Sequence, residues 1–266
     1  MTPTTFVVPL DGSEFAERAV AVAAALAHQS GGGMLLMTAL ERGPLHPREY
    51  LDEIAARHAD VPIQRVVDAD RYAAEAIVHV LEESPDRIVC MTSHGRGGIR
   101  WGMVGSVAEE VIRRASRSTV LVGRHCRDDF LAGAPHMLVC TDGSVSSAQL
   151  APVALDWAER LKLDVHAAIV VHPLDVESAE HPEVLIDPIV EQFGGADHVV
   201  AKVLTGRFVE GALADYADDL PAALIAVNCH GRTGLARFAL GSTTMGLLHQ
   251  ASCPLLVTSM RPAEGR

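Results

Sequence analysis

An aspartate followed by glycine and serine occurs twice in the chain, each time directly after a short apolar run. Asp11 follows the run from Phe6 to Leu10, and Asp142 follows the run from Met137 to Thr141. A carboxylate beyond the end of a buried strand can accept hydrogen bonds from ribose hydroxyls or from an adenine amine. The same carboxylate can also serve as a turn or helix-capping residue. Both interpretations stay open at this point.

Two glycines separated by nine residues form a second repeated pattern. Gly95 and Gly105-Ser106 follow one apolar run, and Gly231 and Gly241-Ser242 follow another. Glycines allow the backbone to approach a bulky anion, and the amides at a helix start point toward it with the favourable end of the helix dipole. The spacing therefore predicts a phosphate-binding loop. No GxxxxGK[ST] occurs and no GxGxxG follows the first strand of either copy, which argues against a P-loop NTPase and a standard dinucleotide-binding domain.

The two patterns recur in the same order, which indicates a tandem duplication. Asp142 lies 142 − 11 = 131 residues after its counterpart, and Gly231 lies 231 − 95 = 136 residues after its own, so the second copy carries a five-residue insertion. We predict two domains, residues 1–127 and 134–266. The linker is predicted over His125 to Pro135, where polar residues and Gly133 suit an exposed connection.

Each copy alternates short apolar runs with helical stripes, as a doubly wound parallel sheet requires. We expect Ser13 to cap the first helix and the glycines at 31–33 to end it. The predicted fold is α/β, with two tandem five-stranded Rossmann-like domains. A loop with a short helix around Ile189 is expected between the second and third strands of the second copy. The predicted strands are Phe6–Leu10, Met34–Leu40, Ile63–Val67, Arg87–Thr92 and Thr119–Val122, then Met137–Thr141, Val165–Val171, Val199–Leu204, Leu224–Asn228 and Leu255–Thr258.

Composition and charge exclude several classes of protein. Of 266 residues, 48% are hydrophobic and 21% charged, which is typical of a globular protein and unlike a disordered one. No apolar run is long enough for a membrane span and no signal-peptide pattern opens the chain, so we expect a soluble, cytoplasmic protein. The net charge of −12 would repel a nucleic-acid backbone. Five cysteines without CxxC spacing and scattered histidines predict buried thiols and no metal site.

At this point the sequence resembles the universal stress protein family, in particular its tandem-domain members. The resemblance rests on the Asp-Gly-Ser turns, the segment Ser93-His94-Gly95-Arg96, the nine-residue spacer, the Gly-Ser helix start and the final strands. Its ATP-binding members carry the pattern GxxG, nine residues, then G and S or T. The resemblance implies ATP, with or without Mg²⁺, as the ligand of both copies.

The family's binding residues map onto matching positions in each copy. The strand 1 aspartate, which holds the ribose and base side, maps onto Asp11 and Asp142, and the residue beside adenine at the end of strand 2 maps near Thr38 and Val170. The first glycine of the family pattern is Thr92 in one copy and Asn228 in the other. A side chain there would narrow the triphosphate path or donate a hydrogen bond to it. The full implied set is Pro9, Asp11, Thr38, Thr92, Gly95, Gly105, Ser106, Val107, Asp142, Val170, Asn228, Gly231, Gly241, Ser242 and Thr243.

The two copies differ at the helix start. Ser106 and Glu109 fit a capping box, which would place a negative charge one turn from the phosphate. The corresponding stretch in the second copy, Ser242 to Met245, has no acid and three hydroxyls. We therefore expect the second copy to accept a polyphosphate more readily.

Three functions remain open. The favoured one is a non-catalytic ATP-binding module acting in stress regulation. The others are a slow ATPase or phosphoryl- or adenylyl-transferring enzyme in the same pocket, for which a positioned base or metal-binding acid is needed, and an interaction scaffold that binds no nucleotide. Family domains commonly pair through their last strand, which implies an intrachain pseudo-dimer of Thr119–Val122 with Leu255–Thr258. A homodimer of the whole chain is a further option.

Overall fold

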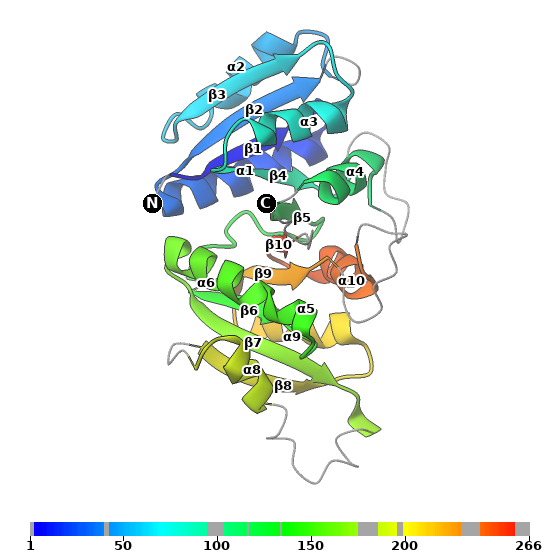
Figure 1. Cartoon of the computed structure of the whole chain (residues 1–266). Helices are drawn as coiled ribbons and strands as arrows, with labels where there is room; N and C mark the ends of the chain where they lie inside the picture. The colour runs from blue at the N-terminus through cyan, green and yellow to red at the C-terminus, as the bar shows by residue number, and fades with distance from the viewer. Residues whose placement is uncertain are drawn as a thin grey trace, which may run out of the picture. The chain divides into compact units, whose positions relative to one another are not determined.

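The computed structural model describes residues 3–39, 43–94, 104–115, 117–133, 135–174, 186–195, 199–229 and 240–258. The chain divides into two compact units, Met1–Val122 and Gly123–Arg266 (Figure 1), and each unit is described by itself.

The first unit alternates strands and helices in the expected order. Its strand 1 core, Phe6 to Val8, is fully buried. Parallel pairing gives the order β3-β2-β1-β4-β5. The elements are β1 (Thr5–Pro9), α1 (Glu14–Ser30), β2 (Gly33–Ala39), α2 (Pro47–Ala56), β3 (Ile63–Asp68), α3 (Ala73–Glu82), β4 (Arg87–Thr92), α4 (Ser106–Arg114) and β5 (Thr119–Val122).

The second unit repeats this topology, with all strands parallel in the order β8-β7-β6-β9-β10. The counterpart of α1 is split into two helices at Gln149, close to Pro152, whose ring nitrogen cannot donate a helical hydrogen bond. The elements are β6 (His136–Cys140), α5 (Val145–Ala148), α6 (Leu150–Leu161), β7 (Asp164–Val171), α8 (Ile186–Gln192), β8 (Val199–Thr205), α9 (Val209–Asp219), β9 (Ala222–Asn228), α10 (Ser242–Gln250) and β10 (Leu255–Thr258).

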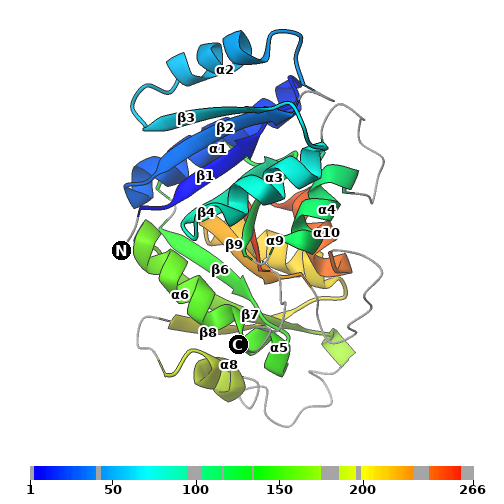
Figure 2. The same cartoon turned by 45° about the horizontal axis from the view of Figure 1, so that its top comes forward.

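Helices cover both faces of each sheet, as right-handed crossovers require. In the first unit, α1 and α2 share a face and are joined by the hydrogen bond from Tyr50 Oη to Glu17 Oε1 at 3.1 Å. The α3 and α4 helices pack against each other on the opposite face. The same arrangement recurs in the second unit, where α9 packs on α10 (Figure 2).

These elements confirm the predicted α/β class and place every predicted strand within two residues of its observed bounds. Ser13 caps α1 by accepting from the Ala16 amide at 3.2 Å, and Gly31 ends the helix at φ +66°. The short helix around Ile189 is α8. Four of the five cysteines are buried, and burial raises the pKa of the Cys253 thiol.

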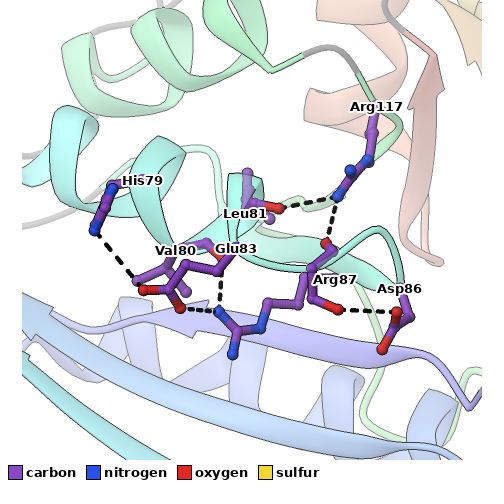
Figure 3. Close-up of polar contacts among 8 residues, drawn as sticks. His79, Val80, Leu81, Glu83, Asp86, Arg87 and Arg117 are labelled. Carbon is purple, nitrogen blue, oxygen red and sulfur yellow. Dashed lines mark hydrogen bonds and ion pairs between the residues drawn. The ribbon is translucent and has the colours of Figure 1, made fainter.

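Two arginines, instead of a glycine, close the C-terminal end of α3 (Figure 3). Arg117, just before β5, donates through Nη1 to the carbonyl oxygens of Leu81 at 2.9 Å and Ser84 at 2.6 Å. Arg87 donates to the Val80 carbonyl at 2.8 Å and also pairs with Glu83. The final carbonyls of a helix need such partners because no amide follows them in the helix. This end of the sheet is therefore tied to α3 by side chains from two strand starts.

We predict that Arg117→Ala lowers the free energy of unfolding by about 2 kcal/mol, because it removes a charged donor shared by two carbonyls. Urea denaturation followed by circular dichroism would measure the loss. Arg113→Ala is the matched control, since its pairing with Glu110 is exposed to solvent and should contribute much less. Equal losses in the two variants would contradict the capping role of Arg117.

Candidate functional site

Each strand 1 aspartate organises the turn that starts the following helix. Asp11 Oδ1 accepts from the Ser13 amide at 3.0 Å and from Ser13 Oγ at 2.6 Å. Asp142 Oδ1 accepts from the Ser144 amide at 3.0 Å, and Ser144 Oγ in turn accepts from the Ser147 amide. The intervening glycines have φ of +81° and +73°, a region that side chains disfavour. Asp11 and Asp142 therefore act as turn residues, which was one of the two interpretations of the sequence. Their hydrogen bonds hold both half-buried carboxylates at the strand ends.

Strand pairing brings each aspartate beside the loop that follows strand 4. Val7 pairs with Val89, so four residues further on Asp11 lies level with Ser93. Val139 pairs with Ala226, so three residues further on Asp142 lies level with Cys229. Neighbouring strands are about 4.8 Å apart. In both units the two segments converge at the point where the strand order reverses, which is the usual ligand position in such sheets.

Glycine caps the helix that starts beside this loop in both units. The Gly105 amide donates to the Ser93 carbonyl at 2.7 Å, and the Gly241 amide donates to the Cys229 carbonyl at 2.9 Å. A Cβ added at Gly105 would lie 3.2 Å from the Ser93 oxygen, whereas one at Gly241 would lie 3.5 Å from the Cys229 oxygen. Close backbone approach therefore requires glycine more strictly in the first unit.

The capping box predicted for Ser106 and Glu109 is wrong. Gly105 is the N-cap residue of α4, and no side chain caps the helix. Ser106 is the first helical residue and is exposed, as is its counterpart Ser242 in α10. A capping box needs its hydroxyl at the N-cap position, whereas Ser106 lies one residue after the N-cap residue of α4. Glu109 nevertheless stays in the first turn of α4, while the first turn of α10 contains no acid.

The side chains at the first-glycine position of the family pattern bond to the protein itself. Thr92 is buried, and its Oγ1 donates to the His94 carbonyl at 2.7 Å. Asn228 Oδ1 accepts from Thr258 Oγ1 at 3.1 Å, and the Asn228 carbonyl accepts from Thr244 Oγ1 at 3.2 Å. The Thr92 hydroxyl is thus directed into its own loop, and the Asn228 amide oxygen is directed toward β10.

The two strand 2 positions predicted for the base, Thr38 and Val170, are one residue out of register with each other. Thr38 is buried, with 1% of its surface exposed, and its Oγ1 has no partner in the described part of the chain. Pro9 pairs with Met37 and Cys140 pairs with Ala168, so the register makes Ile169 the counterpart of Thr38, one residue before Val170. Ile169 lies near the second aspartate turn, because a Cβ added at Gly143 would be 3.8 Å from its Cδ1.

The remaining predicted site residues fall into two groups. Pro9 ends β1, Val107 follows Ser106 in the first turn of α4, and Thr243 holds the same place in α10; all three are partly exposed. Gly95 and Gly231 lie outside the described residues, as do the arginines of the two spacers, Arg96, Arg100, Arg232 and Arg237.

A hydroxyl network in the second unit has no counterpart in the sequence prediction. Thr141 Oγ1 lies 2.8 Å from Ser147 Oγ and 3.0 Å from Gln192 Oε1, and it accepts from the Gly143 amide at 3.1 Å. Leu10 and Ala16 occupy the equivalent positions in the first unit, 131 residues earlier. Gln192 belongs to α8, and only the fold brings it to the turn.

Acidic groups surround the first site more densely than the second. Glu14 and Glu17 lie in the first turn of α1, whereas the first turn of α5 has no acid. Burial raises the pKa of Tyr50 above its usual range, and the carboxylates of Glu17 and Asp11 raise it further. Arg57 offsets part of this charge through its 3.0 Å contact with Glu17. The first turns of the helices at the aspartate turn and at the glycine cap therefore contain more acid in the first unit than in the second.

These features define a tandem α/β protein with a glycine-capped helix start beside an aspartate turn at the switch point of each unit. The chain belongs to the universal stress protein family, whose sequence profile matches residues 3–123 and again residues 134–259. This confirms the resemblance noted from the sequence.

One sequence relative and two solved structures illustrate the relationship. A universal stress protein of Mycobacterium tuberculosis is 30% identical over 184 residues, which cover 64% of this chain and 61% of the relative. The crystal structure of a universal stress protein from Archaeoglobus fulgidus matches with a TM-score of 0.67 at 15% identity. The match covers 97% of this chain and 99% of the Archaeoglobus chain. A putative universal stress protein from Pseudomonas aeruginosa gives 0.66 at 14% identity, covering 97% and 94%. The structural matches show the shared fold.

The described residues contain neither a candidate membrane span nor a candidate metal cluster. No helix there combines the length and the apolar composition that a membrane span needs. The same residues contain no cluster of three or more His, Cys, Asp or Glu side chains suited to a metal ion.

We predict that Gly105→Ala is more destabilising than Gly241→Ala, by about 1 kcal/mol, because only the first crowds a backbone oxygen. Both variants lose the same N-cap glycine, so each serves as the control for the other. Chemical denaturation of the two full-length variants would measure the difference. A larger loss for Gly241→Ala would contradict the close approach at Gly105.

Proposed function

We propose that the protein is a non-catalytic ATP-binding universal stress protein that acts in stress regulation in the cytoplasm. The observation that carries the proposal is the convergence, in both units, of a strand 1 aspartate turn with a glycine-capped helix start. The first amides of α4 and α10 have no acceptor within their helices and lie at the positive end of the helix dipole. Such a place suits a phosphate without any positively charged side chain, as an acidic chain requires.

The surrounding residues fit a nucleotide at this place. Ser106 and Ser242 are exposed at the helix starts and can donate hydroxyl hydrogen bonds to phosphate oxygens. Asp11 and Asp142 lie in the turns that follow the neighbouring strands β1 and β6, where a carboxylate can accept from ribose hydroxyls. The buried Thr38 hydroxyl, without a partner among the described residues, is a polar group that a base could satisfy. Mg²⁺ enters this proposal as the companion ion of the triphosphate.

The second unit is proposed as the tighter site. Its aspartate turn has a hydroxyl network where the first unit has apolar residues, and the first turns of its α5 and α10 contain no acid. The first unit places Glu14, Glu17 and Glu109 in the corresponding first turns. A triphosphate therefore meets less repulsion in the second unit.

The last strand of each unit, β5 or β10, is an edge strand of its own five-stranded sheet. Edge strands are templates for pairing with a further strand. We propose that these two strands support the pairing of the units within one chain, and that a homodimer of whole chains is the alternative assembly.

We predict that Gly241→Asp weakens the stronger phase of ATP binding by about tenfold or more, while Gly105→Asp affects only the weaker phase. Aspartate is a favourable N-cap residue, so each variant should fold while placing a negative charge at the phosphate position. Isothermal titration of the full chain with ATP, with and without Mg²⁺, would measure both phases.

Three results of this titration would count against the proposal. Loss of the stronger phase in Gly105→Asp would reverse the order of the two sites. Unchanged binding in both variants would move the nucleotide away from the helix starts. Absence of ATP from the freshly purified protein, together with absence of binding in the titration, would favour an interaction scaffold.

We predict no ATP turnover above that of buffer in a single-turnover assay with protein in excess. Among the described residues, the only acid in the first turn of either site helix is Glu109, whereas hydrolysis needs a positioned base or metal-binding acid. Turnover that disappears in Gly105→Asp or Gly241→Asp would instead identify a slow ATPase. Glu109→Gln would then show whether that residue takes part.

A further inference from the structure

Two exposed aromatic rings occupy the same position in the two units. Tyr72 is 70% exposed and Phe208 is 72% exposed. Tyr72 is the N-cap residue of α3, and Phe208 is the N-cap residue of α9. Neither side chain caps its helix by a hydrogen bond, so local helix chemistry does not account for an aromatic residue at this place.

Strand register confirms that the two positions are equivalent. Ala39 pairs with Asp68 at the end of β3, and Val170 pairs with Leu204 near the end of β8. Tyr72 follows Asp68 by four residues, and Phe208 follows Leu204 by the same number. The duplicated fold thus carries a ring at the same point of the carboxyl edge in both halves.

The loop before Phe208 lies against the strand end assigned to the base side of the proposed nucleotide. The Gly206 amide donates to the Val171 carbonyl at 3.0 Å. A Cβ added at Gly206 would lie 3.6 Å from Val170 Cγ1. Phe208 follows two residues later, so this exposed ring is attached just beyond the backbone contact between Gly206 and Val171.

The helix that Phe208 begins also packs against the helix of the phosphate position. A Cβ added at Gly246 of α10 would collide with the Glu210 side chain, and one added at Gly211 of α9 would approach Gln250 Oε1 at 4.0 Å. Ser242, the first residue of α10, precedes Gly246 by one turn. The start of α9 therefore packs against the second half of α10, about one turn beyond Ser242. In the first unit α3 likewise packs against α4 (Figure 2).

One cation and one acid flank Phe208 along the chain, Arg207 before it and Glu210 in the first turn of α9. Arg207 is exposed and has no ion pair among the described residues. Its counterpart Arg71 is held by Asp68, with Nη1 3.0 Å from Oδ2, and Leu204 replaces that acid in the second unit. A flat ring flanked by an available guanidinium matches a base joined to phosphates better than it matches an apolar peptide.

We propose that Phe208, and Tyr72 in the first unit, stack on the base of the bound nucleotide and make the site selective for nucleotides over other polyphosphates. This inference rests on the proposed function and adds a specificity residue to it. Stacking on an aromatic ring is available to any base, because every base has a flat π face. The aspartate turn and the helix start would hold the sugar and phosphates, and the ring would cover the base.

The test compares ATP with inorganic tripolyphosphate, which has the phosphates without the base. Phe208→Ala is made in the Gly105→Asp background, so that the second site is measured alone in the full chain. We expect Phe208→Ala to weaken ATP binding by about 5- to 100-fold and to leave tripolyphosphate binding within about twofold. Val200→Ala is the control, because Val200 is an exposed apolar residue near the N-terminal end of β8, away from Phe208. This variant should change neither ATP binding nor tripolyphosphate binding.

A second readout does not depend on affinity. Phe208→Trp should bind ATP about as well as the wild type, and its indole fluorescence should be quenched by ATP but not by tripolyphosphate. Tyr72→Trp in the Gly241→Asp background should show the same contrast in the first unit.

The outcomes separate this inference from the function on which it rests. Absence of both ATP and tripolyphosphate binding in the parent would overturn the proposed function and this inference with it. Normal ATP binding in Phe208→Ala, with no quenching in Phe208→Trp, would overturn the stacking role alone. An equal loss of ATP and tripolyphosphate binding in a folded Phe208→Ala protein would assign the ring to shaping the phosphate site, which also contradicts stacking.

Discussion

The parallel pairing of strand 1 with strand 4 is the constraint on which both sites depend. Because β1 pairs with β2 on one side and β4 on the other, the aspartate turn and Ser93 stand at adjacent strand ends. The Gly105 amide then returns to the Ser93 carbonyl, so the start of α4 lies beside the same strand end. The same pairing of β6 with β7 and β9 produces the second site, so one packing rule generates both.

Duplication has kept the backbone of the site while its electrostatics have changed. The amide bonds of Gly105 and Gly241 to the preceding loop are nearly identical, at 2.7 and 2.9 Å. Around them, the first unit has acids and apolar residues where the second has hydroxyls. The backbone geometry is set by the fold and tolerates these side-chain replacements. The electrostatic potential at the site, in contrast, depends on each charged side chain.

Local patterns in the sequence predicted the fold well, and the fold brings the predicted aspartate turns beside the glycine-capped helix starts. Buried strands, the Ser13 cap and the glycine stop at Gly31 depend on neighbouring residues alone. The prediction of a capping box at Ser106 and Glu109 was wrong because α4 begins one residue earlier than that pattern requires. The hydrogen bond from the Gly105 amide to the Ser93 carbonyl makes Gly105 the N-cap residue, and the local sequence does not contain this information. Other features depend on register and packing between distant segments, which no local pattern contains. Examples are the contact of Gln192 with the Thr141 hydroxyl and the equivalent positions of Tyr72 and Phe208 in the two units.

The glycine caps also connect ligand supply to stability by mass action. A helix start without a side-chain acceptor gains its missing partners when an anion lies there, so occupancy adds to the free energy of unfolding of that unit. For a ligand that binds only the folded state, the gain is about 2.7 kcal/mol when the free concentration is about 100 times Kd. The persistence of each half in the cell would then follow the nucleotide pool, with the two halves responding over different concentration ranges.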